Sequence, residues 1–274
     1  MQDQKLAILG GGNMGGALLR GILEKKVLQP KNVIVIDVDT ALLDSIKTEH
    51  GVAVSTDAKE AIADVDAVML AVKPQVLPQL LGDIKSVLRP EQLVLSIVAG
   101  LKGTYIQHAL GQNNPVVRIM PNIAATVQRS ASAITACEPA TAEHLTFAND
   151  LLSAVGAVVE VAEAQMDAVT GLSGSGPAFV YTFIEALIDG GVRMGLTRPV
   201  ARTLAIATVR GAAELVEVSG EHPGILRDRV TTPGGTTIAG LQALEEGAFR
   251  ATVIHGVEAA TERSAELGAI PKSR

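Results

Sequence analysis

The feature that most constrains the fold is a run of glycines between an apolar strand and an amphipathic helix. Residues 5–9 (KLAIL) predict a strand, residues 10–15 (GGGNMG) follow at once, and residues 14–25 place apolar side chains at helical spacing. A second strand is expected at 33–36 (VIVI), whose continuous β-branched residues are typical of a parallel strand covered on both faces. The chain therefore begins with a β-α-β unit.

Helices and buried strands continue to alternate up to about residue 161. Further strands are expected near 52–54, 67–72, 93–98, 116–119, 131–135 and 157–161, with helices near 41–50, 75–87 and 141–154. This order predicts an α/β Rossmann domain over residues 1–162, built on a doubly wound, mostly parallel sheet.

The strand signal stops after this point, and residues 163–274 predict an all-α second domain. Its helices are expected near 164–171, 177–194, 199–218, 223–229, 235–246 and 249–267. The helices at 177–194 and 199–218 are apolar or rich in alanine around much of their circumference, more than one small domain can hide. We therefore expect a partner subunit to cover the rest.

Composition narrows the classes of ligand. A net charge of -6 gives no basic stripe to neutralise a phosphate backbone, and two Tyr, four Phe and no Trp leave little for base stacking, so no nucleic acid is expected as a partner. No apolar run approaches the ~20 residues of a membrane helix, and the first strand is too short for a signal-peptide core. Cys137 is the only cysteine, which precludes an intrachain disulfide. We expect a cytoplasmic protein with a small-molecule ligand and no membrane partner.

The glycine run has the G-x-G-x-x-G spacing of a loop that binds the pyrophosphate of a dinucleotide. Gly10 would permit the tight turn, Gly12 would let the backbone approach the pyrophosphate, and Gly15 would let the helix pack closely. The helix start would offer unpaired N–H groups and the positive end of its dipole to the phosphates. The predicted loop residues at the cofactor are Gly10, Gly11, Gly12, Asn13 and Met14.

Asp37 follows the second strand, where a carboxylate can accept hydrogen bonds from the hydroxyls of the adenosine ribose. A 2′-phosphate would meet a like charge there, and no arginine stands at positions 36–40 to receive it. This favours NADH over NADPH. The alternative is that Asp37 is only a turn residue after a strand.

Three further segments are expected at the carboxyl edge of the sheet, the edge where open α/β sheets bind ligands. They are Ala71, Val72, Lys73 and Pro74 closing the fourth strand, Ala99 after the next strand, and Asn122 after the strand at 116–119. Lys73 could serve the cofactor ribose or cap its strand. Asn122 could reach the nicotinamide amide or form a turn.

Two glycine-rich islands interrupt the predicted helices, at 171–177 (GLSGSGP) and 230–237 (VTTPGGTT). Both would put hydroxyls and free N–H groups at helix starts, which suits a small carboxylate, although ordinary N-capping is the alternative. His222 and His255 stand alone, and no residues have metal-ligand spacing, so no metal is expected. Hydride transfer to an already electrophilic substrate would tolerate such a site.

Four segments together resemble pyrroline-5-carboxylate reductase, and the resemblance spans nearly the whole chain. They are AVKP at 71–74, RIMPN at 118–122, DAVTGLSGSGPAF at 167–179 and RVTTPGGTTIAGLQALEEGAFR at 229–250. The resemblance implies NAD(P)H-dependent reduction of the C=N bond of 1-pyrroline-5-carboxylate to L-proline. It also implies a Rossmann domain followed by a dimerisation domain, assembled as an interlocked homodimer or a ring of such dimers.

The resemblance also implies roles for single residues. Thr237 would place its hydroxyl near the ring nitrogen of the substrate, and Glu163 would lie close to the substrate, where a carboxylate favours the protonated iminium. A solvated acid is the alternative for Glu163. The substrate-binding set is Ser175, Thr232, Gly235, Thr236 and Thr237, with backbone N–H groups around 235–237 on the substrate carboxylate.

The chain departs from the family pattern in places. Asp37 stands where many members have Ser, Asn or Arg suited to NADPH, so the cofactor is left as NADPH or NADH. Ile123 and Ala124 replace a frequent Thr-Pro, and Arg229 replaces an asparagine of some relatives. The alternatives in function are a non-catalytic NAD(P)H-binding regulatory protein and a reductase of another cyclic imine.

Overall fold

The computed structural model describes residues 3–269, which divide into two compact units. The first unit contains the residues up to 175 together with those from 259 onward, and the second contains residues 176–258. The predicted order, a Rossmann domain and then a helical domain, is confirmed. The first compact unit runs past residue 162 and includes the end of the last helix. The domain boundary expected at 162/163 stays a prediction.

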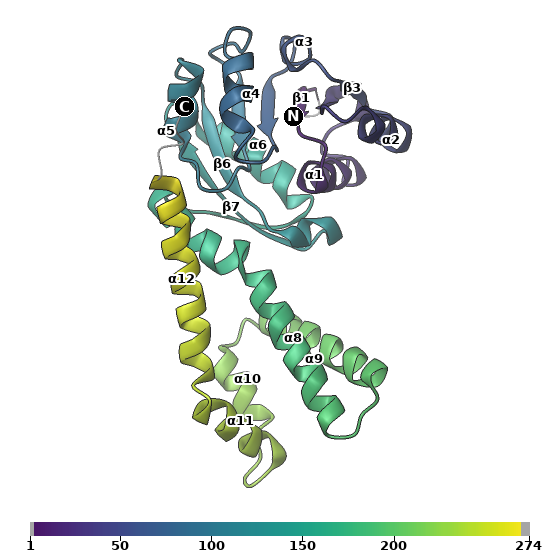
Figure 1. Cartoon of the computed structure of the whole chain (residues 1–274), viewed down its shortest axis with the longest axis vertical. Coiled ribbons are helices and arrows are strands. Elements are labelled where there is room, and N and C mark those ends of the chain that lie inside the picture. The colour runs from purple at the N-terminus through teal and green to yellow at the C-terminus, as the bar shows by residue number, and fades with distance from the viewer. Residues whose placement is uncertain (1–2, 270–274) are drawn as a thin grey trace. The chain divides into compact units, whose positions relative to one another are not determined.

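One eight-stranded sheet forms the centre of the first unit, in the order β3-β2-β1-β4-β5-β6-β7-β8 (Figure 1). The strands are β1 (Leu6–Leu9), β2 (Val33–Ile36), β3 (Ala53–Ser55), β4 (Ala67–Leu70), β5 (Leu93–Ser96), β6 (Val116–Met120), β7 (Ser130–Cys137) and β8 (Gly156–Glu160). Neighbouring strands are parallel except for β6 and β7. Strands β1, β4 and β5 are buried throughout, as expected for parallel strands covered on both faces.

Helices cover both faces of this sheet. They are α1 (Asn13–Glu24), α2 (Thr40–His50), α3 (Ala58–Ile62), α4 (Leu77–Ile84), α5 (Gly103–Leu110) and α6 (Ala142–Ser153). The short helix α7 (Met166–Val169) comes after β8 in the chain. Leu6 and Ile8 of β1 share a core with α1, α2 and α6, whereas Ala7 and Leu9 share another with α3, α4 and α5. Figure 1 shows α4 and α5 together, away from α1 and α2. Because β1 lies between β2 and β4, the strand order reverses at β1 and β4, which is where such sheets bind ligands.

Two short helices and the ends of β4 and β5 are among the differences from the prediction, since β5 ends at Ser96 and was expected to reach residue 98. Helices α3 and α5 were not expected, since five and eight residues give little periodic signal. A local cap sets the start of α3, where the Asp57 carboxylate accepts from the N–H groups of Lys59 and Glu60. Strand β4 ends at Leu70, so residues 71–74 lie beyond the strand instead of closing it.

The second unit is helical, as predicted. Its helices are α8 (Gly176–Arg193), α9 (Arg198–Ser219), α10 (Pro223–Arg229), α11 (Thr236–Glu246) and the first part of α12 (Phe249–Ala269). Within residues 176–258, all of which the structure describes, only Ala201 and Ala205 are buried. A single copy of this unit therefore lacks a core of its own. Among residues 3–269, no helix is long and apolar enough to cross a membrane.

Candidate active site

The glycine loop between β1 and α1 contains two glycines that the fold requires and one that it does not. Gly10 has φ +110°, and a Cβ there would lie 2.6 Å from the carbonyl oxygen of Ala71. A Cβ on Gly15 would overlap the carbonyl oxygen of Gly10. A Cβ on Gly12 would meet no heavy atom of the described chain within 4 Å, apart from its chain neighbours, and its φ of -64° suits any residue. The space in front of Gly12 is therefore open to a ligand.

Helix α1 begins at this open space without a cap. Gly12 is its N-cap residue, and no side chain among residues 3–269 caps the helix start. The N–H groups of the first turn, from Asn13 and Met14 onward, have no acceptor within the helix. Together with the helix dipole they form an anion site, which suits the pyrophosphate of a dinucleotide.

Asp37 lies directly beside this loop. Its Oδ2 accepts from the Gly11 N–H at 2.8 Å, and its Oδ1 accepts from the Asp39 N–H at 3.1 Å. A carboxylate has about four acceptor positions, so both oxygens can still accept from ribose hydroxyls. The structure thus joins two residues of the predicted cofactor set, Gly11 and Asp37, through one hydrogen bond.

A cavity of about 440 Å³ lies at the carboxyl edge of β4 and β5. Its lining residues are Pro74, Gln75, Ala99, Gly100, Thr170, Ser175, Ala260, Arg263, Ser264 and Leu267. It brings together Pro74 and Ala99, predicted at the cofactor, and Ser175, predicted at the substrate. Ala71 and Val72 are half-buried beside Pro74 in sequence, and Lys73 is exposed.

The end of α12 lines one side of this cavity, which was not predicted from the sequence. Ser264 Oγ donates to Asp167 Oδ1 at 2.6 Å, which ties α12 to α7. Arg263 pairs with Glu266 at 2.6 Å on the same helix. A helical pattern alone could not reveal these roles, because the tie joins residues 97 positions apart in the chain.

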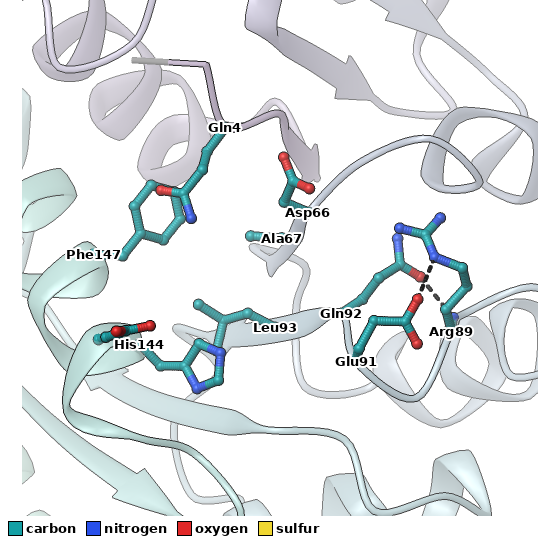
Figure 2. Close-up of a pocket in the computed structure, with 10 residues that line it drawn as sticks. Gln4, Asp66, Ala67, Arg89, Glu91, Gln92, Leu93, His144 and Phe147 are labelled. Atoms are coloured by element: carbon teal, nitrogen blue, oxygen red, sulfur yellow. Dashed lines mark hydrogen bonds and ion pairs between the residues drawn. The ribbon is translucent and has the colours of Figure 1, made fainter. Parts of the chain in front are cut away.

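A smaller cavity of about 190 Å³ lies at the opposite edge, where β4 and β5 begin at Ala67 and Leu93 (Figure 2). Some of its polar groups are already hydrogen-bonded within the protein. Asp66 Oδ2 accepts from the Lys5 N–H at 2.8 Å, and Gln92 Nε2 donates to the carbonyls of Ile62 and Val65. Since open α/β sheets bind ligands at the carboxyl edge, this cavity is not the candidate site.

The first glycine-rich island differs from its prediction. Residues Thr170–Gly174 form a π-helical turn after α7, and only Ser175 separates it from α8, which begins at Gly176 with Pro177 in its first turn as predicted. The Ser175 N–H donates to the Thr170 carbonyl at 2.9 Å, and the Ser173 hydroxyl donates to Val169 at 3.0 Å. These bonds occupy groups that were expected to be free for a ligand, because helical hydroxyls can bond the preceding turn.

The end of β6 contacts this same segment. Asn122 Nδ2 donates to the Ser173 carbonyl at 3.1 Å, and Asn122 Oδ1 accepts from the Ala124 N–H at 3.1 Å. The amide is therefore engaged within the protein, as the turn-forming interpretation requires. Contact of Asn122 with nicotinamide stays a prediction.

Glu163 is not a solvated acid, because it forms an ion pair with the buried Arg118 of β6. Cys137, at the end of β7, lies within electrostatic reach of both. Burial raises the pKa of the Cys137 thiol, the Glu163 carboxylate raises it further, and the Arg118 guanidinium acts in the opposite direction. No partner for Arg118 was predicted from the sequence.

The second island forms the start of α11, as predicted. Gly235 is the N-cap residue, no side chain of the described chain caps this helix, and the Gly235 N–H donates to the Thr232 carbonyl at 3.0 Å. Thr236 and Thr237 occupy the first turn, so their N–H groups have no acceptor within the helix. Arg229, at the end of α10, pairs with Glu221 through Nη2 and Oε1 at 2.7 Å. The substrate roles of these residues stay predictions.

No three His, Cys, Asp or Glu side chains within residues 3–269 gather as ligands for a metal ion.

Comparison with known proteins identifies two matching regions. A family model described as pyrroline-5-carboxylate reductase dimerisation matches residues 163–267. A model described as NADP oxidoreductase coenzyme F420-dependent matches residues 5–100, which include the glycine loop.

Relatives and solved structures agree over the full length. The chain is 46% identical to pyrroline-5-carboxylate reductase of Methanosarcina acetivorans over 98% of this chain and 99% of that protein. It is 45% identical to the Synechocystis enzyme over 96% of this chain and 98% of that one. The pyrroline-5-carboxylate reductase structure from Coxiella burnetii has a TM-score of 0.93 at 32% identity, covering 97% of this chain and 98% of that one.

A Plasmodium falciparum pyrroline carboxylate reductase with NADP bound has a TM-score of 0.87 at 32% identity, covering 98% of this chain and 100% of that one. With the relatives above, these likenesses span the glycine loop, the carboxyl edge of the sheet and the uncapped start of α11. The chain belongs to the pyrroline-5-carboxylate reductase family.

Proposed function

We propose that this chain reduces the C=N bond of 1-pyrroline-5-carboxylate to give L-proline, with NADH or NADPH as reductant. The observation that carries the proposal is the uncapped, threonine-rich start of α11 in a chain whose glycine loop leaves open space for a dinucleotide. The bound dinucleotide supplies the hydride for the imine carbon. The protein must then bind the carboxylate, orient the ring and favour the protonated imine nitrogen.

The start of α11 suits the substrate carboxylate. The N–H groups of Gly235, Thr236 and Thr237 and the helix dipole would attract a small anion, and Thr232 would line the same pocket. The Thr237 hydroxyl would orient the ring nitrogen. Ser175 and Glu163 are further candidates for substrate binding, and a carboxylate such as that of Glu163 would favour the protonated iminium, which is the better hydride acceptor.

The Thr237→Ala variant should lower kcat by about 10- to 100-fold, because the substrate loses an orienting hydrogen bond near the reacting atoms. Affinity for the dinucleotide, measured by fluorescence titration, should stay unchanged. The matched control is Thr252→Ala in α12, where the hydroxyl only bonds the Ala248 carbonyl of its own helix. If Thr237→Ala turns over as fast as wild type, Thr237 does not orient the substrate.

Asp37 supports a preference for NADH within this proposal. Its carboxylate is fixed beside the pyrophosphate loop, and Asp39 follows two residues later, so a 2′-phosphate would meet like charge. Asp37 would accept hydrogen bonds from the ribose hydroxyls. Ala71, Val72, Lys73, Pro74, Ala99 and Asn122 would complete the cofactor site at the carboxyl edge.

The Asp37→Ser variant should raise the ratio of NADPH to NADH use by at least about tenfold, because the like charge is removed. The ratio is measured as kcat/KM with each cofactor. Asp37→Asn separates charge from shape, since it keeps an acceptor for the Gly11 N–H and loses only the charge. An unchanged ratio in both variants would show that Asp37 does not select the cofactor.

The chain contains a dimerisation domain, so we expect the active protein to self-associate. We propose an interlocked homodimer, which further dimers could join into a ring. The large apolar side chains that one copy leaves exposed on the second unit support this assembly. On α8 and α9 they include Val180, Tyr181, Phe183, Leu187, Val200, Leu204, Ile206, Leu215 and Val218.

The test of function is oxidation of NADH and, separately, of NADPH by the purified protein with 1-pyrroline-5-carboxylate, with the product identified as proline. Rapid oxidation supports the proposal. A six-membered cyclic imine assayed in parallel tests the alternative substrate. Dinucleotide binding without oxidation of either imine would favour the non-catalytic regulatory protein.

A further inference from the structure

Arg118 is a buried cation in the middle of the sheet. It lies on β6, its side chain is 10% exposed, and its Nη1 pairs with Oε1 of Glu163. A buried guanidinium is tolerated when a carboxylate neutralises it. Glu163 lies in the short segment that follows β8, so this pair joins the sheet to the segment leading into α7.

Arg118 is one of three alternate residues of β6 and its extension that contact residues 163–174. Arg118 pairs with Glu163, and Asn122 donates to the Ser173 carbonyl. The ε-methyl of Met120 lies so close to Gly174 that a Cβ there would be only 2.6 Å from it. Alternate residues of a strand share one face, so one face of the RIMPN motif packs against residues 163–174.

One oxygen of the Glu163 carboxylate accepts no hydrogen bond within the described residues. Its Oε2 is enclosed and has no hydrogen-bond partner among residues 3–269. A buried acceptor without a donor is unfavourable and is uncommon in folded proteins. The Glu163 side chain is 36% exposed and its Oε1 is bound to Arg118, so Oε2 is the carboxylate oxygen left for a further donor.

We propose that Arg118 is a positioning residue, which holds Glu163 through Oε1 and reserves Oε2 for the ring N–H of the protonated imine. Arg118 does not touch the substrate in this scheme. It fixes the position of the Glu163 carboxylate, while Met120 and Asn122 contact the segment that carries Glu163. The inference rests on the proposed function, because the donor that Oε2 lacks is the substrate.

A double-mutant cycle in the full-length protein separates this role from a merely structural one. Arg118→Met should lower kcat at least about tenfold while the dinucleotide Kd stays unchanged, and Arg118→Lys should recover part of the loss. In a Glu163→Gln background, Arg118→Met should cost less than about threefold, since its effect passes through Glu163. Losses that multiply across the two sites would overturn the proposal.

Failure of the proposed function gives a different result, because wild-type protein would then be inactive with the imine. Binding of L-proline to the NAD⁺ complex by calorimetry provides a readout that does not depend on turnover. If Arg118→Met does not fold, the same cycle is run with Arg118→Lys. If Arg118→Lys lowers kcat by the same factor in the wild-type background and in the Glu163→Gln background, the proposal is likewise overturned.

Cys137 reports on the ion pair in solution, because it is the only cysteine in the chain. Glu163 raises the pKa of its thiol and Arg118 lowers it. The pH profile of iodoacetamide alkylation should therefore move to lower pH in Glu163→Gln and to higher pH in Arg118→Met. In Arg118→Lys it should move to higher pH when the shorter side chain places its charge farther from Cys137. Profiles that coincide with wild type in Glu163→Gln and Arg118→Met would show that the pair does not form, which overturns the proposal.

Discussion

The Gly12→Ala variant is expected to fold as stably as wild type and to bind dinucleotide about 10 to 100 times more weakly. The protein leaves open space at this position, and the backbone there is in an ordinary conformation, so the added methyl group strains nothing. It would instead occupy the space into which the pyrophosphate must come. Thermal unfolding and fluorescence titration with NADH and NADPH measure the two effects separately.

Two other glycines provide the matched comparison. Gly15→Ala should lower the free energy of unfolding by about 1 to 3 kcal/mol, because its Cβ would overlap the Gly10 carbonyl. It should also weaken dinucleotide binding. Gly82→Ala, in an open position on α4, should stabilise the protein by about 0.5 to 1 kcal/mol and leave binding alone. Full affinity in Gly12→Ala would exclude the loop as the pyrophosphate site.

Much of the first unit could be predicted because its signals are local. A buried strand, a glycine loop and an amphipathic helix each leave a pattern within a few residues, and their alternation predicts the doubly wound sheet. The start of α11 at Thr236 was predictable for the same reason, since a glycine before two threonines indicates a helix start.

The errors arose where the local geometry is unusual or where distant residues decide the structure. The glycines and serines of 171–177 predicted a longer interruption than the structure has, because a π-helical turn and a hydroxyl bond to the preceding turn keep residues 170–174 helical. The partner of Arg118 lies 45 residues away in the chain, so no local pattern could name it. The alternation of Arg118, Met120 and Asn122 was visible in the sequence, and it could have indicated one shared face.

Charges placed on α9 are expected to have the largest effect on assembly. Helical spacing puts Val200, Leu204, Leu215 and Val218 on one side of this helix, and all four are exposed in a single chain. A contiguous apolar stripe of this kind indicates a surface that another chain covers. The second unit needs such cover, because residues 176–258 bury only Ala201 and Ala205 by themselves.

A Leu204→Asp, Leu215→Asp double variant should dissociate and lose helicity together. Burying a leucine contributes about 1.5 to 3 kcal/mol, so four lost leucines per dimer weaken association by at least about 6 kcal/mol, or about four powers of ten in Kd. Sedimentation measures the mass and circular dichroism the helicity. Arg202→Asp puts the same carboxylate on another side of α9 and should stay associated. A double variant that remains dimeric and helical would mean that this stripe is not the interface, and the missing core of the second unit would have to come from another face.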